Sequence, residues 1–211
     1  MSIADLRKEY TLAGLRKKDL DADPIRQFRT WLEQAMELVP EPNAMVLATA
    51  DKIGRPSARV VLLKGIEERG FTFFTSYESR KAADLADNPR AALVFYWAPV
   101  ERQVCITGDV SRLTRAEAEA YFKTRPRGNR LGAWASRQSQ PITNRAELEE
   151  RLQQAEARYP DDNIPTPPNW GGYLLAPARL EFWQGRPNRL HDRFCYTKEP
   201  GAAWRLERLS P

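Results

Sequence analysis

The sequence predicts an α+β protein built on an antiparallel β-sheet or barrel, and three observations support this fold class. Short segments rich in β-branched and aromatic residues follow one another from Ala44 to about residue 107, separated by turn signals such as Asp51–Gly54. Few helical segments interrupt them, so most strands can pair as hairpins without the crossover helices of a parallel sheet. No GxGxxG motif follows a strand and no GxxxxGK[ST] motif is present, which removes the main support for Rossmann and P-loop folds.

Eight segments have the composition of strands. They cover residues 44–50, 57–64, 71–76, 91–97, 102–108, 172–185, 188–198 and 203–209. The segment 57–64, SARVVLLK, is apolar between charged ends and is expected to be a buried strand. On a regular strand Arg59 and Lys64, five residues apart, should point to opposite faces.

Four segments predict helices. The first begins at Asp23, an N-cap residue followed by Pro24 at the first helical position, and Pro40 ends it. Apolar residues recur in it at helical spacing, namely Ile25, Phe28, Trp31, Leu32, Ala35 and Leu38. The others are expected at residues 79–89, at 114–124, where a capping box begins the helix, and at about 144–159. Residues 1–20 are polar and aperiodic, which predicts a flexible arm before a single domain of residues 21–211.

The composition of the chain limits its possible binding partners but does not distinguish between them. The chain has 211 residues, a formal net charge of +5 and a pI of about 9.3, which fits nucleic acid, an anionic membrane surface or small phosphorylated ligands. The sequence begins without a signal peptide and has no apolar run long enough to span a membrane. Cys105 and Cys195 are expected to be buried, reduced thiols, so a cytoplasmic location is predicted. A single histidine and no cysteine cluster argue against a metal site.

Three basic segments could hold anions. Ser79 is a plausible N-cap that places Arg80 and Lys81 in a first helical turn, where free N–H groups can bind a phosphate. The alternative for these two residues is a pair of solvated surface cations.

In the second segment, strand alternation would put Arg189, His191 and Arg193 on one face, where they repel one another unless an anion or an electron-rich ligand lies there. The alternative is a structural histidine. In the third, Tyr121 and Arg125 share a helix face before Arg127–Arg130, a reasonable phosphate grip or an ordinary basic helix end.

Several stretches, taken in order, resemble the pyridoxamine/pyridoxine 5′-phosphate oxidase family along nearly the whole chain. They are LRKEYTLAGL, RVVLLK, FFTSYESRKA, ERQVCITG, YFKTRPRGNRLGAWAS, RQSQPI, NWGGY, EFWQGRPNRLHDRF and WRLERLSP. The resemblance implies an antiparallel split β-barrel with peripheral helices, assembled as a homodimer with one FMN in each of two interface clefts. The family oxidises pyridoxamine and pyridoxine 5′-phosphate to pyridoxal 5′-phosphate by hydride transfer from C4′ to flavin N5, with O2 reduced to H2O2.

The resemblance also assigns residues by position. Those expected at FMN are Arg59, Val60, Val61, Leu62, Lys64, Phe74, Thr75, Arg80, Lys81, Gln103, Gln138, Ser139, Trp183 and Arg193. Those expected at the substrate are Arg7 and Tyr10 of a closing N-terminal arm, Lys64, Tyr121, Arg125, Asn129, Arg189 and His191. Arg189 and His191 would flank the reacting C4′ group as the catalytic residues.

Two positions depart from the family pattern. Asn129 stands where some relatives carry serine, and it can still donate a hydrogen bond. Phe74 stands where tyrosine is frequent, which removes one hydroxyl near the flavin.

Two other functions compete with the oxidase. A flavin reductase of the same fold would need none of Tyr121, Arg125, Arg189 and His191, so this set argues against it. A nucleic-acid-binding module would spread its cations along an exposed stripe, whereas here they fall in short clusters with interspersed acids.

Overall fold

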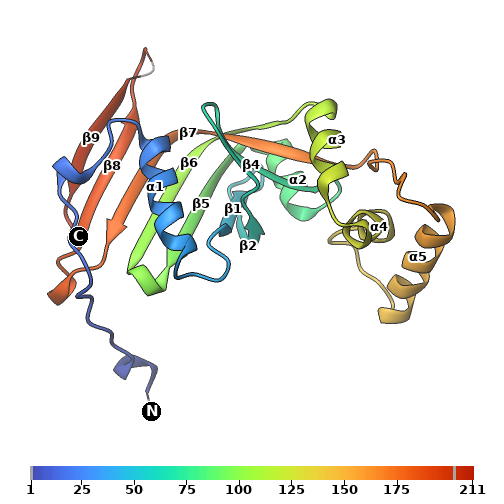
Figure 1. Cartoon of the computed structure of the whole chain (residues 1–211), viewed down its shortest axis with the longest axis horizontal. Coiled ribbons are helices and arrows are strands. Elements are labelled where there is room, and N and C mark those ends of the chain that lie inside the picture. Colours follow the sequence, from blue (N-terminus) through green and yellow to red (C-terminus); the bar gives the residue numbers. More distant parts are fainter. Residues whose placement is uncertain (1, 202) are drawn as a thin grey trace.

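A single antiparallel sheet organises the chain, whose computed structural model describes residues 2–201 and 203–211 (Figure 1). Its strands are β1 Ala44–Ala50, β2 Pro56–Leu62, β3 Gly65–Glu67, β4 Gly70–Ser76, β5 Arg90–Trp97, β6 Arg102–Arg112, β7 Trp170–Gln184, β8 Asp192–Lys198 and β9 Trp204–Leu209. The helices are α1 Pro24–Met36, α2 Arg80–Asp87, α3 Arg115–Thr124, α4 Arg127–Ala135 and α5 Arg145–Arg158. Hydrogen-bonded neighbours run β2-β1-β5-β6-β7-β4-β3, with β8 on β7 and β9 on β8. The predicted α+β antiparallel fold is confirmed.

The long strand β7 changes partner halfway, and this change splits the barrel. Its first half pairs with β4 and its second half with β8, while β6 pairs with it along most of its length. Pro177 lies where the partner changes, and a register shift in β6 lies opposite, between Thr107 and Gly108. A proline has no N–H for the ladder and a bulge bends the strand, so both residues suit a corner of the sheet.

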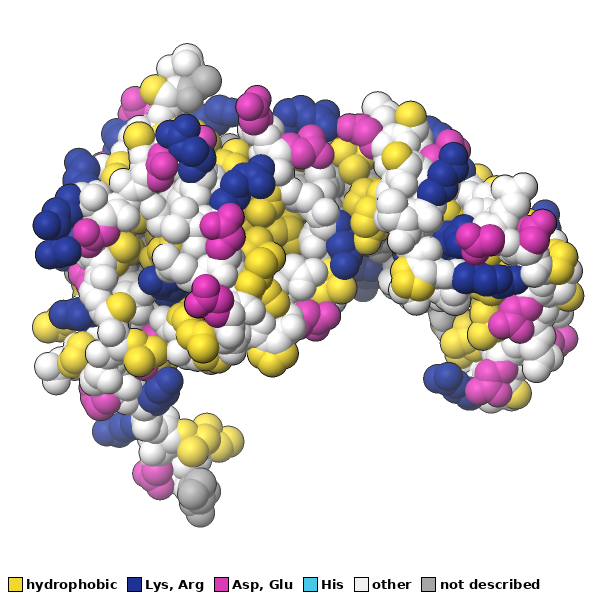
Figure 2. Space-filling view, viewed as in Figure 1, with side chains coloured by type: hydrophobic (Ala, Val, Ile, Leu, Met, Phe, Trp, Pro, Cys, Tyr) yellow, Lys and Arg dark blue, Asp and Glu magenta, His cyan; other side chains and the backbone are white. Residues whose placement is uncertain are grey.

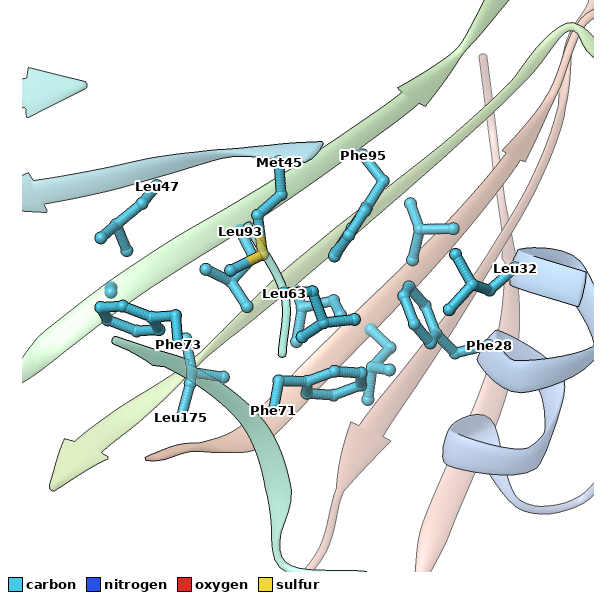
Figure 3. Close-up of a cluster of buried hydrophobic side chains, with 14 of the residues drawn as sticks. Phe28, Leu32, Met45, Leu47, Leu63, Phe71, Phe73, Leu93, Phe95 and Leu175 are labelled. Atoms are coloured by element: carbon cyan, nitrogen blue, oxygen red, sulfur yellow. The ribbon is translucent and has the colours of Figure 1, made fainter. Parts of the chain in front are cut away.

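One face of the sheet holds the main core. Asp23 caps α1 by accepting a hydrogen bond from the Ile25 N–H at 2.8 Å, as its sequence position predicts. The Phe28 ring packs at 5.0 Å from Phe71 and 4.9 Å from Phe95, between helix and sheet (Figure 3). Burying an aromatic side chain of this size contributes about 1.5–3 kcal/mol. The helix ends at Met36, before the expected Leu38, which is exposed because it lies in the following turn.

The opposite face of the sheet is partly exposed and apolar, which corrects the expectation of a buried strand at residues 57–64. Strand β2 lies at the end of the sheet path and alternates between half-buried and exposed residues. Val60 pairs with Val46, which pairs with Val94, so their side chains share this face with Tyr96 two residues along. Val60 is 65% and Tyr96 56% exposed. Apolar patches of this kind mark interfaces.

A helical lobe extends from one end of the sheet, with α4 and α5 away from the main body (Figure 1). Its small core contains Phe122, Leu131, Ala155, Ile164 and Trp170. Helix α4 was not predicted from the sequence, and a glycine within residues 127–130 gives no local signal of a helix. In the structure Gly128 lies inside α4, and a Cβ there would meet nothing within 4 Å. The three-residue strand β3 was also missed.

Candidate cofactor and substrate site

A cleft of about 1050 Å³ opens between the outer end of the sheet and the helical lobe. Figure 2 shows this side of the molecule hollowed between its two masses, with basic side chains in the hollow. The cleft brings together fourteen of the residues expected at FMN or at the substrate. They are Arg59, Val60, Val61, Leu62, Lys64, Phe74, Thr75, Arg80, Lys81, Tyr121, Arg125, Asn129, Gln138 and Ser139.

Arg59 and Lys64 both line the cleft, although they were expected on opposite faces of a strand. The consecutive residues Val60–Leu62 line it as well, so lining the cleft does not report the face to which a side chain points. Leu63 is buried in the main core and Lys64 beside it is exposed, as strand alternation would place them. The expectation of opposite faces is consistent with this pattern.

One end of the cleft is formed by the first turn of α2. Ser79 is the N-cap residue, as expected, but its hydroxyl donates to the Ser76 carbonyl at 2.7 Å and caps no helical N–H. Lys81 is 6% exposed and donates from Nζ to Thr75 Oγ1 at 3.1 Å and to Gln138 Oε1 at 3.3 Å. Burial, followed by the nearby Arg59 charge, lowers the pKa of Lys81 to about 8. Both of these acceptors are neutral, so an anion would stabilise the ammonium.

The other end of the cleft combines aromatic rings with a guanidinium. Phe74 stacks on Tyr121 with ring centroids 3.9 Å apart, and Arg125 lies 4.8 Å over the Trp170 ring. Arg125 is the C-cap residue of α3, four residues after Tyr121, and both residues line the cleft. Arg125 Nη1 is buried and has no hydrogen-bond partner among the described residues. Burial lowers the pKa of Arg125.

The residues of the cleft fit a phosphorylated flavin and a second phosphorylated ligand. The buried Lys81 ammonium and the unpartnered Nη1 of Arg125 are donors that phosphate oxygens could satisfy, one at each end of the cleft. Apolar and aromatic residues between them provide surfaces for a planar ring system.

The remaining expected residues lie outside this cleft. They are Arg7, Tyr10, Gln103, Trp183, Arg189, His191 and Arg193. Gln103, Trp183 and Arg193 occupy one row across β6, β7 and β8, which Tyr96 of β5 continues. Their neighbours in sequence, such as Phe182 and Phe194, face the core, so this row lies on the exposed apolar face of the sheet.

Tyr10 and His191 pack on this row. The Tyr10 ring lies 5.5 Å from Trp183 and 5.6 Å from His191 in edge-on geometry, and Trp183 lies 4.6 Å from His191. His191 Nδ1 accepts a hydrogen bond from the Arg186 N–H at 3.1 Å. Burial, followed by the charge of Arg189, lowers the pKa of His191. Arg7 is exposed.

The alternation proposed for Arg189, His191 and Arg193 is wrong. A 3-10 turn, Pro187–Arg189, precedes β8, and the strand begins only at Asp192. Asn188 and Arg189 have φ of 57° and 62°, in the left-handed region, which interrupts any strand. His191 and Arg193 therefore remain close to the same row, whereas Arg189 is exposed in the turn.

Sequence reasoning missed the polar network behind Arg59. Thr49, Ser57 and Asp84 form hydrogen bonds with one another beneath the cleft. Asp84 follows Arg80 by four residues on α2, and this spacing was the one available signal. Thr49 and Ser57 gave none, because their approach to α2 depends on long-range packing.

The chain matches known proteins over its full length. A sequence profile described as "Pyridoxamine 5'-phosphate oxidase" matches residues 32–159, and one described as "Pyridoxine 5'-phosphate oxidase C-terminal dimerisation region" matches residues 170–211. Proteins named pyridoxine/pyridoxamine 5'-phosphate oxidase are 56% identical in Cyanothece sp. and 55% identical in Cupriavidus taiwanensis. The alignments cover 100% and 99% of this chain, respectively, and 99% of each relative.

Solved structures share the fold. PhzG from Burkholderia lata, in complex with tetrahydrophenazine-1-carboxylic acid, has a TM-score of 0.89 at 31% identity, covering 97% of this chain and 100% of that one. A pyridoxamine 5'-phosphate oxidase-related, FMN-binding protein from Nostoc punctiforme has a TM-score of 0.74 at 21% identity, covering 91% and 100%. With two profiles and full-length relatives in agreement, the chain belongs to the pyridoxamine 5'-phosphate oxidase family.

Proposed function

We propose that the chain is an FMN-dependent oxidase that converts pyridoxamine 5′-phosphate and pyridoxine 5′-phosphate to pyridoxal 5′-phosphate. The observation that carries this proposal is a single cleft with a cationic group at each end, Lys81 with Arg80 at one and Arg125 at the other. One phosphate belongs to the cofactor and the second to the substrate. The names of the full-length relatives support the same activity.

The end of the cleft at α2 holds the cofactor. Arg80 and Lys81 bind the FMN phosphate together with the first N–H groups of the helix. The β2 residues Val60–Leu62 lie beside the ring system, and Phe74 and Thr75 border it from β4. Arg59 lies near Arg80 and Lys81, at the phosphate end. Gln138 and Ser139 approach from the loop after α4.

The lobe end holds the substrate. Arg125, Tyr121, Lys64 and Asn129 bind its phosphate, which fixes the pyridine ring against the cofactor. When bound, the flavin would supply the redox chemistry, taking a hydride from C4′ and passing the electron pair to O2, which would leave as H2O2. The amine substrate would in addition take up water and lose ammonia.

Arg189 and His191 act at the reacting end of the substrate. We assign Arg189 to electrostatic positioning over the ring and His191 to a hydrogen bond with the substrate. Arginine does not lose its proton at accessible pH, so Arg189 is not assigned as a general base.

The second copy of the chain completes each site. Gln103, Trp183, Arg189, His191 and Arg193 lie outside the cleft, on or beside the exposed apolar face of the sheet. A twofold contact through that face would bring this row of one subunit to the cleft of the other. The matched C-terminal dimerisation region supports a homodimer.

The alternatives predict different ligands. A flavin reductase would use the α2 end of the cleft and leave Arg125 and Tyr121 without a role. A nucleic-acid binder would use neither end of this cleft. Among the described residues, none of the helices is long and apolar enough to cross a membrane. Both cysteines are free, which supports the proposed cytoplasmic location.

The visible spectrum of the purified protein tests this proposal. We expect a flavin band that bleaches when pyridoxamine 5′-phosphate is added without oxygen and returns in air. Bleaching only by a nicotinamide donor would favour the reductase. A protein that stays colourless after FMN is added would contradict both flavin functions.

A further inference from the structure

Asp84 is a buried carboxylate behind the cleft that no step of the proposed reaction uses. It lies on α2 and is 2% exposed. Its Oδ2 accepts hydrogen bonds from Thr49 Oγ1 at 2.7 Å and from Ser57 Oγ at 2.5 Å. Its Oδ1 accepts from Arg80 Nε at 3.2 Å. A single carboxylate thus joins α2 to β1 and β2.

The direction of these hydrogen bonds connects Asp84 to Arg59. Arg59 Nη1 donates to Thr49 Oγ1 at 2.8 Å and Arg59 Nη2 donates to Ser57 Oγ at 2.6 Å. A guanidinium only donates, so the protons of both hydroxyls must point to another acceptor. Asp84 Oδ2 accepts both of them. A carboxylate at position 84, which accepts hydrogen bonds and cannot donate them, therefore fixes the orientation of both hydroxyls. Through these hydroxyls it also fixes the guanidinium of Arg59.

The charges agree with this arrangement. Asp84 Oδ2 lies 3.9 Å from Arg59 Nη2, and Arg80 pairs with the other carboxylate oxygen. Burial would raise the pKa of Asp84, but hydrogen bonds from Ser57, Thr49 and Arg80 outweigh it and leave the pKa below its ordinary value. The carboxylate remains charged and reduces the repulsion between two guanidinium groups that border the same cleft.

We propose that Asp84 is a positioning residue that orients Arg59 and Arg80 together toward the phosphate of the cofactor. This inference rests on the proposed FMN site and adds to it a group that does not line the cleft. Two effects of Asp84 oppose each other. Orientation of the guanidinium groups strengthens phosphate binding, whereas a nearby negative charge weakens it. The structure favours orientation, because the carboxylate is already neutralised by its partners.

Asp84→Asn separates these effects. The amide has nearly the same shape as the carboxylate, but its NH2 group is a donor, whereas Thr49, Ser57 and Arg80 all donate to position 84 and need an acceptor there. The affinities of the apoprotein for FMN and for riboflavin, which lacks the phosphate, should be measured by quenching of flavin fluorescence. We expect FMN affinity to fall about tenfold, the cost of one charge-assisted hydrogen bond. Riboflavin affinity should stay unchanged. Asp87→Asn is the matched control, since it removes the same charge from the exposed end of α2.

The outcomes are distinct. Equal or tighter FMN binding by Asp84→Asn would overturn the inference and leave the FMN site intact. Equal loss for FMN and riboflavin would also overturn it, because that is the result of a merely structural role. A wild-type protein that does not prefer FMN to riboflavin would contradict the proposed cofactor site itself.

Ser57→Ala provides a second variant if Asp84→Asn does not fold. It removes one hydroxyl between Arg59 and Asp84 but leaves the carboxylate in place. We expect the same selective loss of FMN affinity, of several-fold, since half of the connection is cut. An unchanged FMN affinity in this variant would likewise overturn the inference.

Discussion

Lys81 combines two properties that usually exclude each other, deep burial and a positive charge. Its ammonium finds only a hydroxyl and an amide oxygen, so desolvation lowers its pKa from 10.5 to about 8. A phosphate beside it would restore the charged form. On the proposed function, the same residue would destabilise the apoprotein and bind the cofactor, as is common where binding sites hold perturbed groups.

This pKa predicts opposite effects of pH on binding and on stability. Between about pH 8 and 10.5 the unfolded chain keeps a proton on Lys81 that the folded apoprotein loses, so this residue makes the apoprotein more stable as pH rises. FMN affinity should fall over the same range, by up to about tenfold per pH unit, because the neutral amine cannot pair with phosphate. Fluorescence titrations between pH 7 and 9 measure this effect.

Lys81→Met isolates the contribution of Lys81 to the pH dependence of FMN affinity. Its FMN affinity should be lower and should lose this part of the pH dependence, whereas riboflavin binding should not depend on Lys81. A pH profile that is the same in Lys81→Met and in the wild type would show that another group titrates.

At single residues, the family resemblance identified fourteen residues that border one cleft, while the roles assigned to them remain predictions. No local pattern brings these residues together, because they come from strands and helices that meet only through tertiary packing. The network of Asp84 could not be predicted, because hydroxyls on two strands meet it only after folding.

At the scale of elements, the N-terminal arm is attached at several points. The Leu12 N–H donates to Glu101 Oε2 at 3.1 Å and the Leu15 N–H donates to Asp192 Oδ2 at 3.0 Å. Arg186 Nη1 donates to the Ala13 carbonyl at 3.1 Å. Tyr10 packs so closely on Gly185 that a Cβ there would lie 2.7 Å from its Cγ. These contacts hold Tyr10 beside His191.

We expect Glu101→Gln to loosen the arm. Glu101 is 2% exposed and also pairs with Lys8 at 3.4 Å, so the neutral amide would weaken both contacts. Trypsin should then cleave after Lys8 or Arg16 several-fold faster, a measure of local opening. Glu9→Gln, an exposed change on the same arm, is the control. Equal cleavage rates in the two variants would show that Glu101 does not hold the arm.

Most elements were predictable because their signals are local. Asp23 before Pro24, and Thr114 with Glu117, begin α1 and α3 as expected. The turn Pro187–Arg189 was taken for strand because its neighbours alternate, and only the positive φ of Asn188 and Arg189 breaks the pattern. Asparagine enters the left-handed region more readily than most residues, but an arginine in that region gives no local signal.

At the scale of the whole molecule, one chain presents two separated sets of the residues expected at the site. The cleft lies between sheet and lobe, whereas Trp183, His191 and Arg193 lie with the exposed apolar face. On the proposed function, one chain alone would therefore not form a complete site. The pairing of β7 with β4, β6 and β8 produces this separation, and such long-range pairing could not be predicted from the sequence.

Val46→Glu should therefore prevent assembly. Val46 is 37% exposed on the apolar face and does not line the cleft, so a buried carboxylate there would oppose a twofold contact. Light scattering should show a monomer. Quenching of flavin fluorescence should show weakened FMN binding. Ile53→Glu, at a turn that is 68% exposed, should stay dimeric. A dimer in Val46→Glu at wild-type affinity would place the interface elsewhere.

Complementation between two inactive variants tests whether this chain is an oxidase whose site takes residues from both subunits. Arg125→Ala removes a cleft residue and Arg189→Ala removes one from the other set, and the two should be coexpressed with different tags. The purified heterodimer contains one intact site, so we predict about half of the wild-type oxidation of pyridoxamine 5′-phosphate, while both homodimers are nearly inactive. A heterodimer as inactive as its parents would contradict the composite site.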